Sequence, residues 1–214
     1  MKTFETPLGN FTLDIIGHAS FHLVWQGKNI FFDPYSEVAD FSKYPSADLI
    51  IITHNHYDHL DMSAISKITK ADTLIICDSN SSEVLKDTIV LRYGESYNYN
   101  GIIVAAHPAY NIKNLREDGK PYHPRGFVNG YSLNFKGFKF YVAGDTELIP
   151  EMNSLRDIDL ALMPKNLPYT MSDSQFIEAA NIIKPRFLYA THYFELDKES
   201  LQKRLNKDIT LLND

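Results

Sequence analysis

Residues 53–61 read THNHYDHLD, so three histidines and two aspartates fall within nine positions. They directly follow DLIIIT at residues 48–53, a continuous apolar run that is typical of a strand buried on both faces. Polar side chains in the loop after such a strand are often functional, because the strand end holds them in place. The polar segment therefore needs a chemical explanation rather than a purely structural one.

Residues two apart in an extended segment point the same way, so His54 and His56 can address one point. Asp58 and His59 lie where the next helix is expected to begin, and they can address a neighbouring point. This arrangement suits two divalent ions about 3.5–4 Å apart, and imidazole with carboxylate but no thiolate suits zinc, manganese or iron. The alternative is a solvated loop whose histidines cap a helix. That alternative would be preferred for a single histidine, but the whole pattern favours metal ligands.

Composition bounds the class of protein. The chain has 214 residues, of which 44% are hydrophobic and 22% charged, as in ordinary globular proteins. Its formal net charge of -6 disfavours non-specific binding of nucleic acid or anionic membranes. The single cysteine, Cys77, excludes a disulfide within the chain and favours a reducing compartment. The first 17 residues lack the apolar core of a signal peptide, and no apolar run is long enough to span a membrane. We therefore expect a cytoplasmic protein.

Short strand-like runs alternate with a few helical segments, and we expect one domain over residues 1–214. Asp61 is expected to cap the first helix, and Ser172 with Gln175 forms the capping-box pattern of a later helix that ends before Pro185. A turn at Lys136-Gly137 predicts a hairpin. The pattern favours mixed sheets covered by helices. Strands are expected at 11–16, 21–25, 29–33, 48–53, 73–77, 101–106, 128–135, 138–144, 158–163 and 186–191, and helices at 61–68, 80–86, 172–184 and 197–206.

The polar cluster, YVAGDT at 141–146 and LYATHY at 188–193 together resemble the metallo-β-lactamase fold superfamily, and the resemblance covers most of the chain. It implies an α/β fold in which two mixed sheets form an αββα four-layer sandwich, with helices outside and metals at one edge. It also implies that Asp145 bridges two metals and that His192 is the last ligand. Both segments follow expected strands, so the residue pattern and the family pattern agree.

The resemblance implies one more histidine ligand between the cluster and Asp145. His107, in AAHPAYN at 105–111, ends an expected strand and is narrowly preferred. In the register of related proteins Asn111 would take the position, and asparagine is a poor zinc ligand. His123, in the polar loop from Pro108 to Gly126, is the other alternative.

The segments IGHASF, FFDPY, FYVAGDTE and PKNLPYTMS narrow the resemblance to a small group of metal-dependent hydrolases. That group is related to ascorbate-6-phosphate lactonase-like and N-acyl phosphatidylethanolamine phospholipase-like enzymes. It implies that His18 lies near the metals, where it would bind substrate or support a ligand; a hydrogen-bonded turn residue is the equal alternative. Tyr169 is a candidate substrate-binding residue at the mouth of the site, with a plain packing loop as the alternative.

The resulting expectation is a metal-dependent hydrolase with two divalent ions, zinc first and manganese or iron as alternatives. Asp58 would orient the attacking water or accept its proton. The expected substrate is a small-molecule ester, lactone or phosphodiester, with no nucleic-acid partner, while the oligomeric state stays open. A di-iron redox protein or a degraded metal-binding protein of the same fold are the alternatives. The expected ligands are His54, His56 and His107 for the first ion, Asp58, His59 and His192 for the second, and Asp145 for both.

Overall fold

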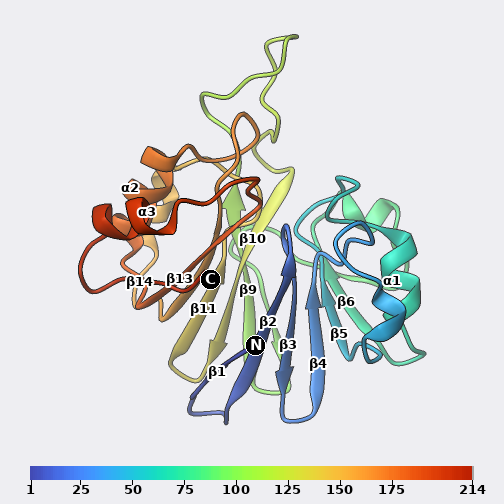
Figure 1. Ribbon diagram of the computed structural model, residues 1–214. Helices are drawn as coiled ribbons and strands as arrows, with labels where there is room; N and C mark the ends of the chain where they lie inside the picture. Colours follow the sequence, from blue (N-terminus) through green and yellow to red (C-terminus); the bar gives the residue numbers. More distant parts are fainter. Residues whose placement is uncertain (214) are drawn as a thin grey trace.

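Two seven-stranded sheets face each other and enclose the main apolar core (Figure 1). The computed structural model describes residues 1–213; Asp214, the last residue of the expected domain, lies outside the described residues. Strands β1 to β7 form the first sheet in sequence order, and β8 to β14 form the second. Each sheet is therefore built from one continuous part of the chain, residues 2–90 and 96–211 respectively.

The first sheet is mixed, because β1 to β4 pair antiparallel and β4 to β7 pair parallel. Leu49 and Ile51 face the core between the sheets, whereas Ile50 packs on the outer side. The strand from the DLIIIT run is thus buried on both faces, as predicted. The strands are β1 (Lys2–Phe4), β2 (Phe11–Gly17), β3 (Ser20–Trp25), β4 (Lys28–Phe32), β5 (Leu49–Ile51), β6 (Leu74–Cys77) and β7 (Ile89–Val90).

The second sheet is also mixed, with β8 to β11 antiparallel and β11 to β14 parallel. The predicted hairpin turn at Lys136-Gly137 is confirmed, because Phe135 pairs with Phe138 across it. The strands are β8 (Ser96–Tyr99), β9 (Ile102–Ala109), β10 (Val128–Phe135), β11 (Phe138–Val142), β12 (Leu160–Pro164), β13 (Phe187–Thr191) and β14 (Thr210–Leu211).

Aromatic rings join the two sheets. Phe11 on β2 stacks on Phe135 of the second sheet with 5.0 Å between ring centroids, and it lies 6.1 Å from Phe140. All three side chains are buried. Each buried ring contributes roughly 1.5–3 kcal/mol, so this layer stabilises the docking of one sheet on the other.

Helices cover the outer faces of both sheets. Helix α1 (Met62–Ile68), capped by Asp61 as predicted, packs on the first sheet. Helices α2 (Asp173–Ile183) and α3 (Lys198–Arg204) pack on the second, and the predicted capping box of Ser172 and Gln175 is present. The expected α/β class, an αββα four-layer sandwich of mixed sheets, is confirmed (Figure 1).

The helices are shorter than the sequence suggested. The helix expected at 80–86 is a single 3-10 turn, Ser81–Glu83, because Asp78 accepts hydrogen bonds from the Asn80 and Ser81 backbones and Asp87 takes a positive φ of 54°. Two further 3-10 turns are Phe41–Lys43 and Pro150–Ser154. Among residues 1–213, no helix has both the length and the apolar character needed to cross a bilayer.

The parallel strands place their carboxyl ends at one edge of the sandwich. The segments that follow β5, β11 and β13 meet at this edge. The loop between β9 and β10 projects from the same edge and is the most extended feature of the molecule (Figure 1). The topology therefore gathers the polar motifs of both halves of the chain in one place.

Candidate metal centre

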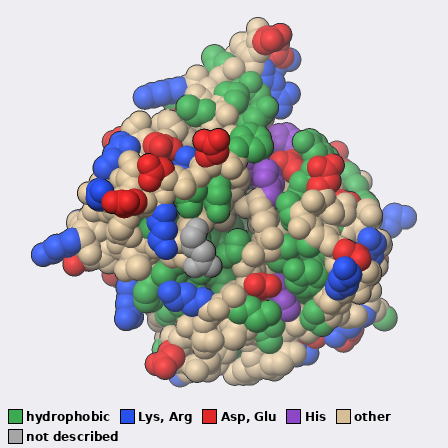
Figure 2. All heavy atoms as spheres, in the orientation of Figure 1, with side chains coloured by type: hydrophobic (Ala, Val, Ile, Leu, Met, Phe, Trp, Pro, Cys, Tyr) green, Lys and Arg blue, Asp and Glu red, His purple; other side chains and the backbone are tan. Residues whose placement is uncertain are grey.

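The polar motifs form one cluster at this edge. The predicted ligands His54, His56, Asp58, His59, Asp145 and His192 lie together, and they are joined by His123 from the projecting loop and by His18 from the turn between β2 and β3. Histidine side chains reach the surface beneath the projecting loop (Figure 2). Strand ends that are far apart in sequence thus contribute to one site.

The cluster divides into groups whose ligand atoms lie within 4.8 Å of one another. One group is His54, His56 and His123. Another is His18, Asp58, His59 and His192. A third group, His54, His59 and Asp145, overlaps these two. Of the residues expected to hold the first ion, His54 and His56 lie with His123 and not with His107.

Asp145 lies between the two groups. Its Oδ2 atom is 3.5 Å from Nε2 of His59, 3.5 Å from Nε2 of His123 and 3.1 Å from Nε2 of His192. One carboxylate oxygen therefore faces both groups, which is the position that a bridging ligand needs.

Three buried imidazole nitrogens test whether the cluster fits metal ions. The Nε2 atoms of His54, His59 and His192 have no hydrogen-bond partner among the described residues. Buried polar atoms in native proteins are nearly always satisfied. His59 and His192 have only carboxylates at ion-pair distance from Nε2, so a cation between these groups would satisfy the nitrogens and the carboxylates together. A divalent cation fits them, because neutral imidazole and carboxylate are its usual donors.

Hydrogen bonds on the other side of the rings fix their orientation. The Thr53 hydroxyl donates a hydrogen bond to Asp33 at 2.6 Å. The same hydroxyl oxygen therefore accepts a hydrogen bond from Nδ1 of His54 at 3.0 Å. Nδ1 of His59 donates to Oδ2 of Asp33 at 2.8 Å. Both rings are thereby oriented with Nε2 toward the centre, as in metal-ligating histidines, whose other ring nitrogen is commonly held by a hydrogen bond.

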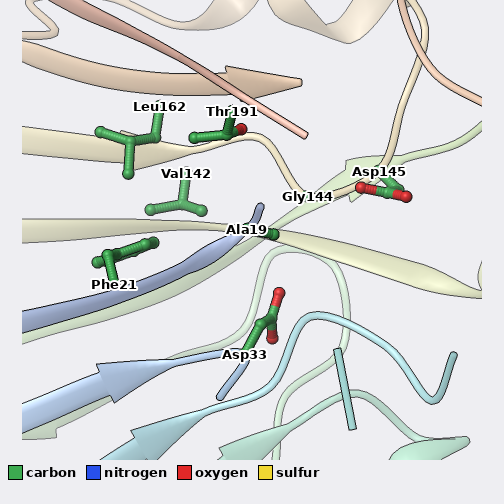
Figure 3. Close-up of a pocket in the computed structure, with 8 residues that line it drawn as sticks. All are labelled: Ala19, Phe21, Asp33, Val142, Gly144, Asp145, Leu162 and Thr191. Atoms are coloured by element: carbon green, nitrogen blue, oxygen red, sulfur yellow. The ribbon is translucent and has the colours of Figure 1, made fainter. Parts of the chain in front are cut away.

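Asp33 is a residue of the site that sequence reasoning missed. It follows β4 in the FFDPY segment, is buried, and also accepts a hydrogen bond from the Thr53 backbone at 2.8 Å. Figure 3 shows Asp33 on one side and Asp145 on the other side of a small cavity of about 10 Å³. The only sequence signal for Asp33 was its place in FFDPY, one of the segments that carried the family resemblance.

The charges in the cluster shift several pKa values. Burial disfavours protonation of His59, but Asp145 and Asp33 outweigh it and raise the His59 pKa well above its usual range. Burial also opposes protonation of His192, yet Asp145 raises its pKa to about 9. For Asp145, burial would raise the pKa, but His192 and His59 hold it well below its usual range. The carboxylates therefore draw positive charge into the centre, as a cation site requires.

The structure corrects the preference for His107. Val104 and Ala106 on β9 face the core between the sheets, so His107 at the next position faces the opposite side. Its Nε2 lies 2.8 Å from Oγ of Ser132, and its ring packs against Tyr141. His107 is therefore not brought to the cluster, and the alternation of the strand is the physical reason.

The two predicted substrate-binding residues, His18 and Tyr169, both line an open cleft of about 610 Å³ above the cluster. Nε2 of His18 lies 2.9 Å from Oδ2 of Asp58. Tyr169 is 41% exposed and stands on the opposite loop, after β12. The cleft gives a small molecule access to Asp58 and Asp145, which also line it.

Comparison with known proteins agrees with this geometry. Residues 12–192 match the model of a family described as a beta-lactamase superfamily domain. A UPF0173 metal-dependent hydrolase of Thermococcus onnurineus is 33% identical over 191 residues, which are 83% of this chain and 82% of the relative. A crystal structure from Parabacteroides distasonis, assigned to a metal-dependent hydrolase, is 41% identical with a TM-score of 0.91 and covers 98% of this chain and 96% of its own.

A metallo hydrolase of Ignicoccus hospitalis shares the fold, with a TM-score of 0.74, 22% identity and 94% of each chain covered. The family match and the relative from Thermococcus onnurineus each span most of the chain. The chain therefore belongs to the beta-lactamase superfamily and, within it, to the UPF0173 metal-dependent hydrolase family.

Proposed function

We propose that the chain is a hydrolase that holds two divalent ions at this centre. The first group (His54, His56, His123) would hold one ion and the second group (Asp58, His59, His192) the other, with Asp145 in contact with both. The observation that carries the proposal is the set of three buried Nε2 atoms without a partner among the described residues, all in the cluster around Asp145.

Bound ions at such a centre lower the pKa of a water molecule toward neutrality and polarise a carbonyl or phosphoryl oxygen of the substrate. The donor set is imidazole and carboxylate, and the one cysteine, Cys77, is buried in β6. Zinc is the first choice for this set, and manganese and iron are the alternatives.

Asp58 is the residue that we propose to handle the proton. Its Oδ2 faces the cleft and accepts a hydrogen bond from His18, while Nε2 of His192 lies 3.4 Å away. Burial would raise the pKa of Asp58, but the hydrogen bond from His18 and the neighbouring His192 imidazole lower it strongly, so the carboxylate is ionised and can accept a hydrogen bond from a water molecule. His18 orients the carboxylate by donating to it.

The proposed reaction is a balanced hydrolysis. The oxygen of water forms a bond to the carbonyl carbon or phosphorus, and the bond from that atom to the leaving oxygen breaks. Asp58 takes one proton from the water, and that proton ends on the leaving oxygen, so the carboxylate is restored. The products are an acid and an alcohol, which in the case of a lactone are the two ends of one hydroxy acid.

The proposed substrate is a small-molecule ester, lactone or phosphodiester. The cleft of about 610 Å³ lies in the range of sites for small ligands. The net charge of -6 and the absence of a basic stretch in the sequence do not suit a nucleic-acid strand.

Metal content and hydrolysis test the proposal together. The protein is reconstituted with zinc or manganese, its metal content is measured, and lactones, phosphodiesters and β-lactams are screened with and without a chelator. We expect about two ions per chain, and hydrolysis that the chelator abolishes. Asp58→Asn should lose activity, whereas Asp208→Asn, at an exposed position, should keep it. Less than one ion per chain after reconstitution would contradict the proposal.

The screen also separates the redox alternative of the same fold. Iron is compatible with the same donor set. A protein that is purified with about two irons, shows a redox-active spectrum and hydrolyses none of the substrates would favour a di-iron oxidoreductase over a hydrolase.

A further inference from the structure

Aromatic rings form both walls of the cleft. On one wall Tyr35 and Tyr57 pack edge to face, with centroids 6.0 Å apart and planes at 72°. On the other wall Tyr122 and Tyr169 do the same at 5.0 Å and 78°. The first pair belongs to loops of the first sheet and the second pair to loops of the second sheet. An occupant of the cleft therefore lies between two aromatic surfaces.

Two of these rings are open to a ligand. Tyr57 is 74% exposed and Tyr169 41% exposed, and Phe194, which also lines the cleft, is 84% exposed. Scattered exposed apolar residues are ordinary, but several gathered around one functional cleft are typical of a binding surface. Aromatic faces bind flat apolar groups by offset or edge-to-face stacking.

Arg116 is the one lysine or arginine among the residues that line the cleft. Its Nη2 donates to the backbone oxygen of Tyr122 at 3.0 Å, and its Cζ lies 5.8 Å from the centroid of the Tyr122 ring. These contacts hold the guanidinium at the wall, and the single hydrogen bond uses one of its five N–H donors. The remaining donors can bind a carboxylate or another anionic group.

The other charges of the cleft limit the charge of the ligand. Glu37, Asp58 and Asp145 line it as well. Asp58 and Asp145 belong to the proposed metal centre, so Glu37 is the acid that faces the ligand. Outside the proposed metal centre, a second negative charge on the substrate would find no lysine or arginine besides Arg116 among the described residues that line the cleft, and it would meet Glu37. Repulsion from Glu37 disfavours a second charged group placed away from the ions.

We propose that the substrate of this site carries a flat apolar group, held between the Tyr35–Tyr57 and Tyr122–Tyr169 pairs, and a single negative charge that pairs with Arg116. The inference rests on the proposed hydrolase function and narrows its substrate class. The tyrosine pairs and Arg116 suit two kinds of substrate: an ester or lactone that carries a carboxylate, and a phosphodiester monoanion. The probes described below distinguish a carboxylate from a phosphodiester group as the source of the negative charge.

Matched chromogenic probes test the charge. The carbonyl pair is the para-nitrophenyl ester of succinate, which keeps one carboxylate, and the neutral para-nitrophenyl butyrate. The phosphoryl pair is bis(para-nitrophenyl) phosphate, a monoanion, and the dianionic para-nitrophenyl phosphate. In at least one pair we expect the zinc-loaded protein to give a higher kcat/KM for the monoanion, and the pair that responds names the reaction class.

Arg116→Gln tests the assignment of the charge to a residue. It should raise KM for the preferred monoanion about fivefold, as loss of a partly exposed ion pair does, with little change in kcat. KM for para-nitrophenyl butyrate should not change. Arg204→Gln is the matched control, because Arg204 is exposed at the end of α3 and does not line the cleft.

Binding gives a readout that does not depend on turnover. Naphthalenesulfonate is a flat monoanion whose sulfonate coordinates metals weakly, and cyclohexanesulfonate is its non-aromatic counterpart. Calorimetry should show tighter binding of naphthalenesulfonate, and Tyr169→Leu should remove most of the difference, since stacking on one ring is worth about 0.5–1.5 kcal/mol, or roughly two- to tenfold.

The outcomes separate the two proposals. Chelator-sensitive hydrolysis without a preference for monoanions, or an unchanged KM in Arg116→Gln, would overturn the substrate class while leaving the hydrolase intact. Equal binding of the two sulfonates would overturn the proposal that the two tyrosine pairs hold a flat apolar group. Preferential binding of naphthalenesulfonate that Arg116→Gln weakens, without hydrolysis of any probe, would support the cleft assignment and count against the hydrolase.

Discussion

The side-chain oxygen of Asn111 lies 2.7 Å from Nδ1 of His123 and 2.8 Å from the backbone nitrogen of the same residue. The amide nitrogen of Asn111 donates to the backbone oxygen of Tyr169 at 2.9 Å, so the oxygen is the acceptor and His123 Nδ1 carries the proton. Nε2 of His123 is thereby left as a lone pair, 3.5 Å from Asp145. The asparagine that the register of the resembling family placed at the ligand position instead orients the histidine.

Replacing Asn111 should weaken the first metal site. Asn111→Leu removes the acceptor for His123, and loss of such a supporting hydrogen bond typically costs about 10- to 100-fold in metal affinity. Titration against a chromophoric chelator measures the loss. Asn153→Leu, at an exposed position of a 3-10 turn, should leave the affinity unchanged. Equal affinities in the two variants would show that Asn111 does not support the site.

His123 and His107 should behave differently on substitution. His123→Gln removes a donor of the first group, and we expect the protein to fall from about two bound ions to about one. His107→Gln alters a side chain that faces Ser132, outside the cluster, and should keep both ions. Elemental analysis after dialysis gives the metal content. The reverse result would return the third ligand to His107.

Asp33 should couple metal binding to stability. Asp33→Asn removes the charge that accepts hydrogen bonds from His59 and from Thr53, so His59 loses its orienting partner. We expect metal affinity to fall roughly 10- to 100-fold and the metal-free protein to lose about 3 kcal/mol of unfolding free energy. Calorimetric metal titration and urea unfolding measure the two effects. Wild-type values for both would mean that the hydrogen bonds are dispensable.

Asp48 should make stability depend on pH at the acid end. Burial would raise the pKa of this carboxyl, but hydrogen bonds from the Asn29 backbone, Lys70 and Lys28 lower it to about 2, against 3.8 ordinarily. The folded chain thus binds fewer protons than the unfolded chain, so the contribution is complete above pH 3.8 and is lost as the pH falls to about 2.

Urea unfolding of Asp48→Asn and wild type checks this expectation. At pH 7 the variant should be about 1–2 kcal/mol less stable, because two ammonium groups lose their charged acceptor. The gap between the two proteins should narrow between about pH 4 and pH 2. A gap that stays constant over this range would assign the stabilising role to some other group.

Local signals in the sequence were enough for much of the fold. The apolar run before the polar cluster, the cap at Asp61 and the capping box at Ser172 each depend on residues within a few positions of one another. Strand ends then follow from the strands, which is why the position of His54 could be anticipated, whereas Asp145 and His192 were indicated by the family resemblance. Such features are encoded in short segments and need no knowledge of distant contacts.

The parts that sequence reasoning did not resolve depend on distant contacts. Buried Glu147 holds the start of the projecting loop by accepting hydrogen bonds from the Lys113 and Asn114 backbones, 34 and 33 residues away. This path of the loop delivers His123 to the cluster. Asp33 reaches His59 across 26 residues, because β4 and β5 lie side by side in the sheet. No periodicity in the sequence records these pairings.

Each sheet is continuous in sequence, so the proposed metal centre connects the first half of the chain to the second half. The first half supplies four donors and the second half supplies the remaining three, so neither half alone holds the complete set. We therefore expect the ions to bind tightly only after the two halves have docked, late in folding. Ions that bind only when the two sheets are packed together oppose the separation of the sheets by mass action. Removal of the ions by a chelator should therefore weaken the packing between the sheets before either sheet unfolds. The donors of the first half are His54, His56, Asp58 and His59, and those of the second are His123, Asp145 and His192.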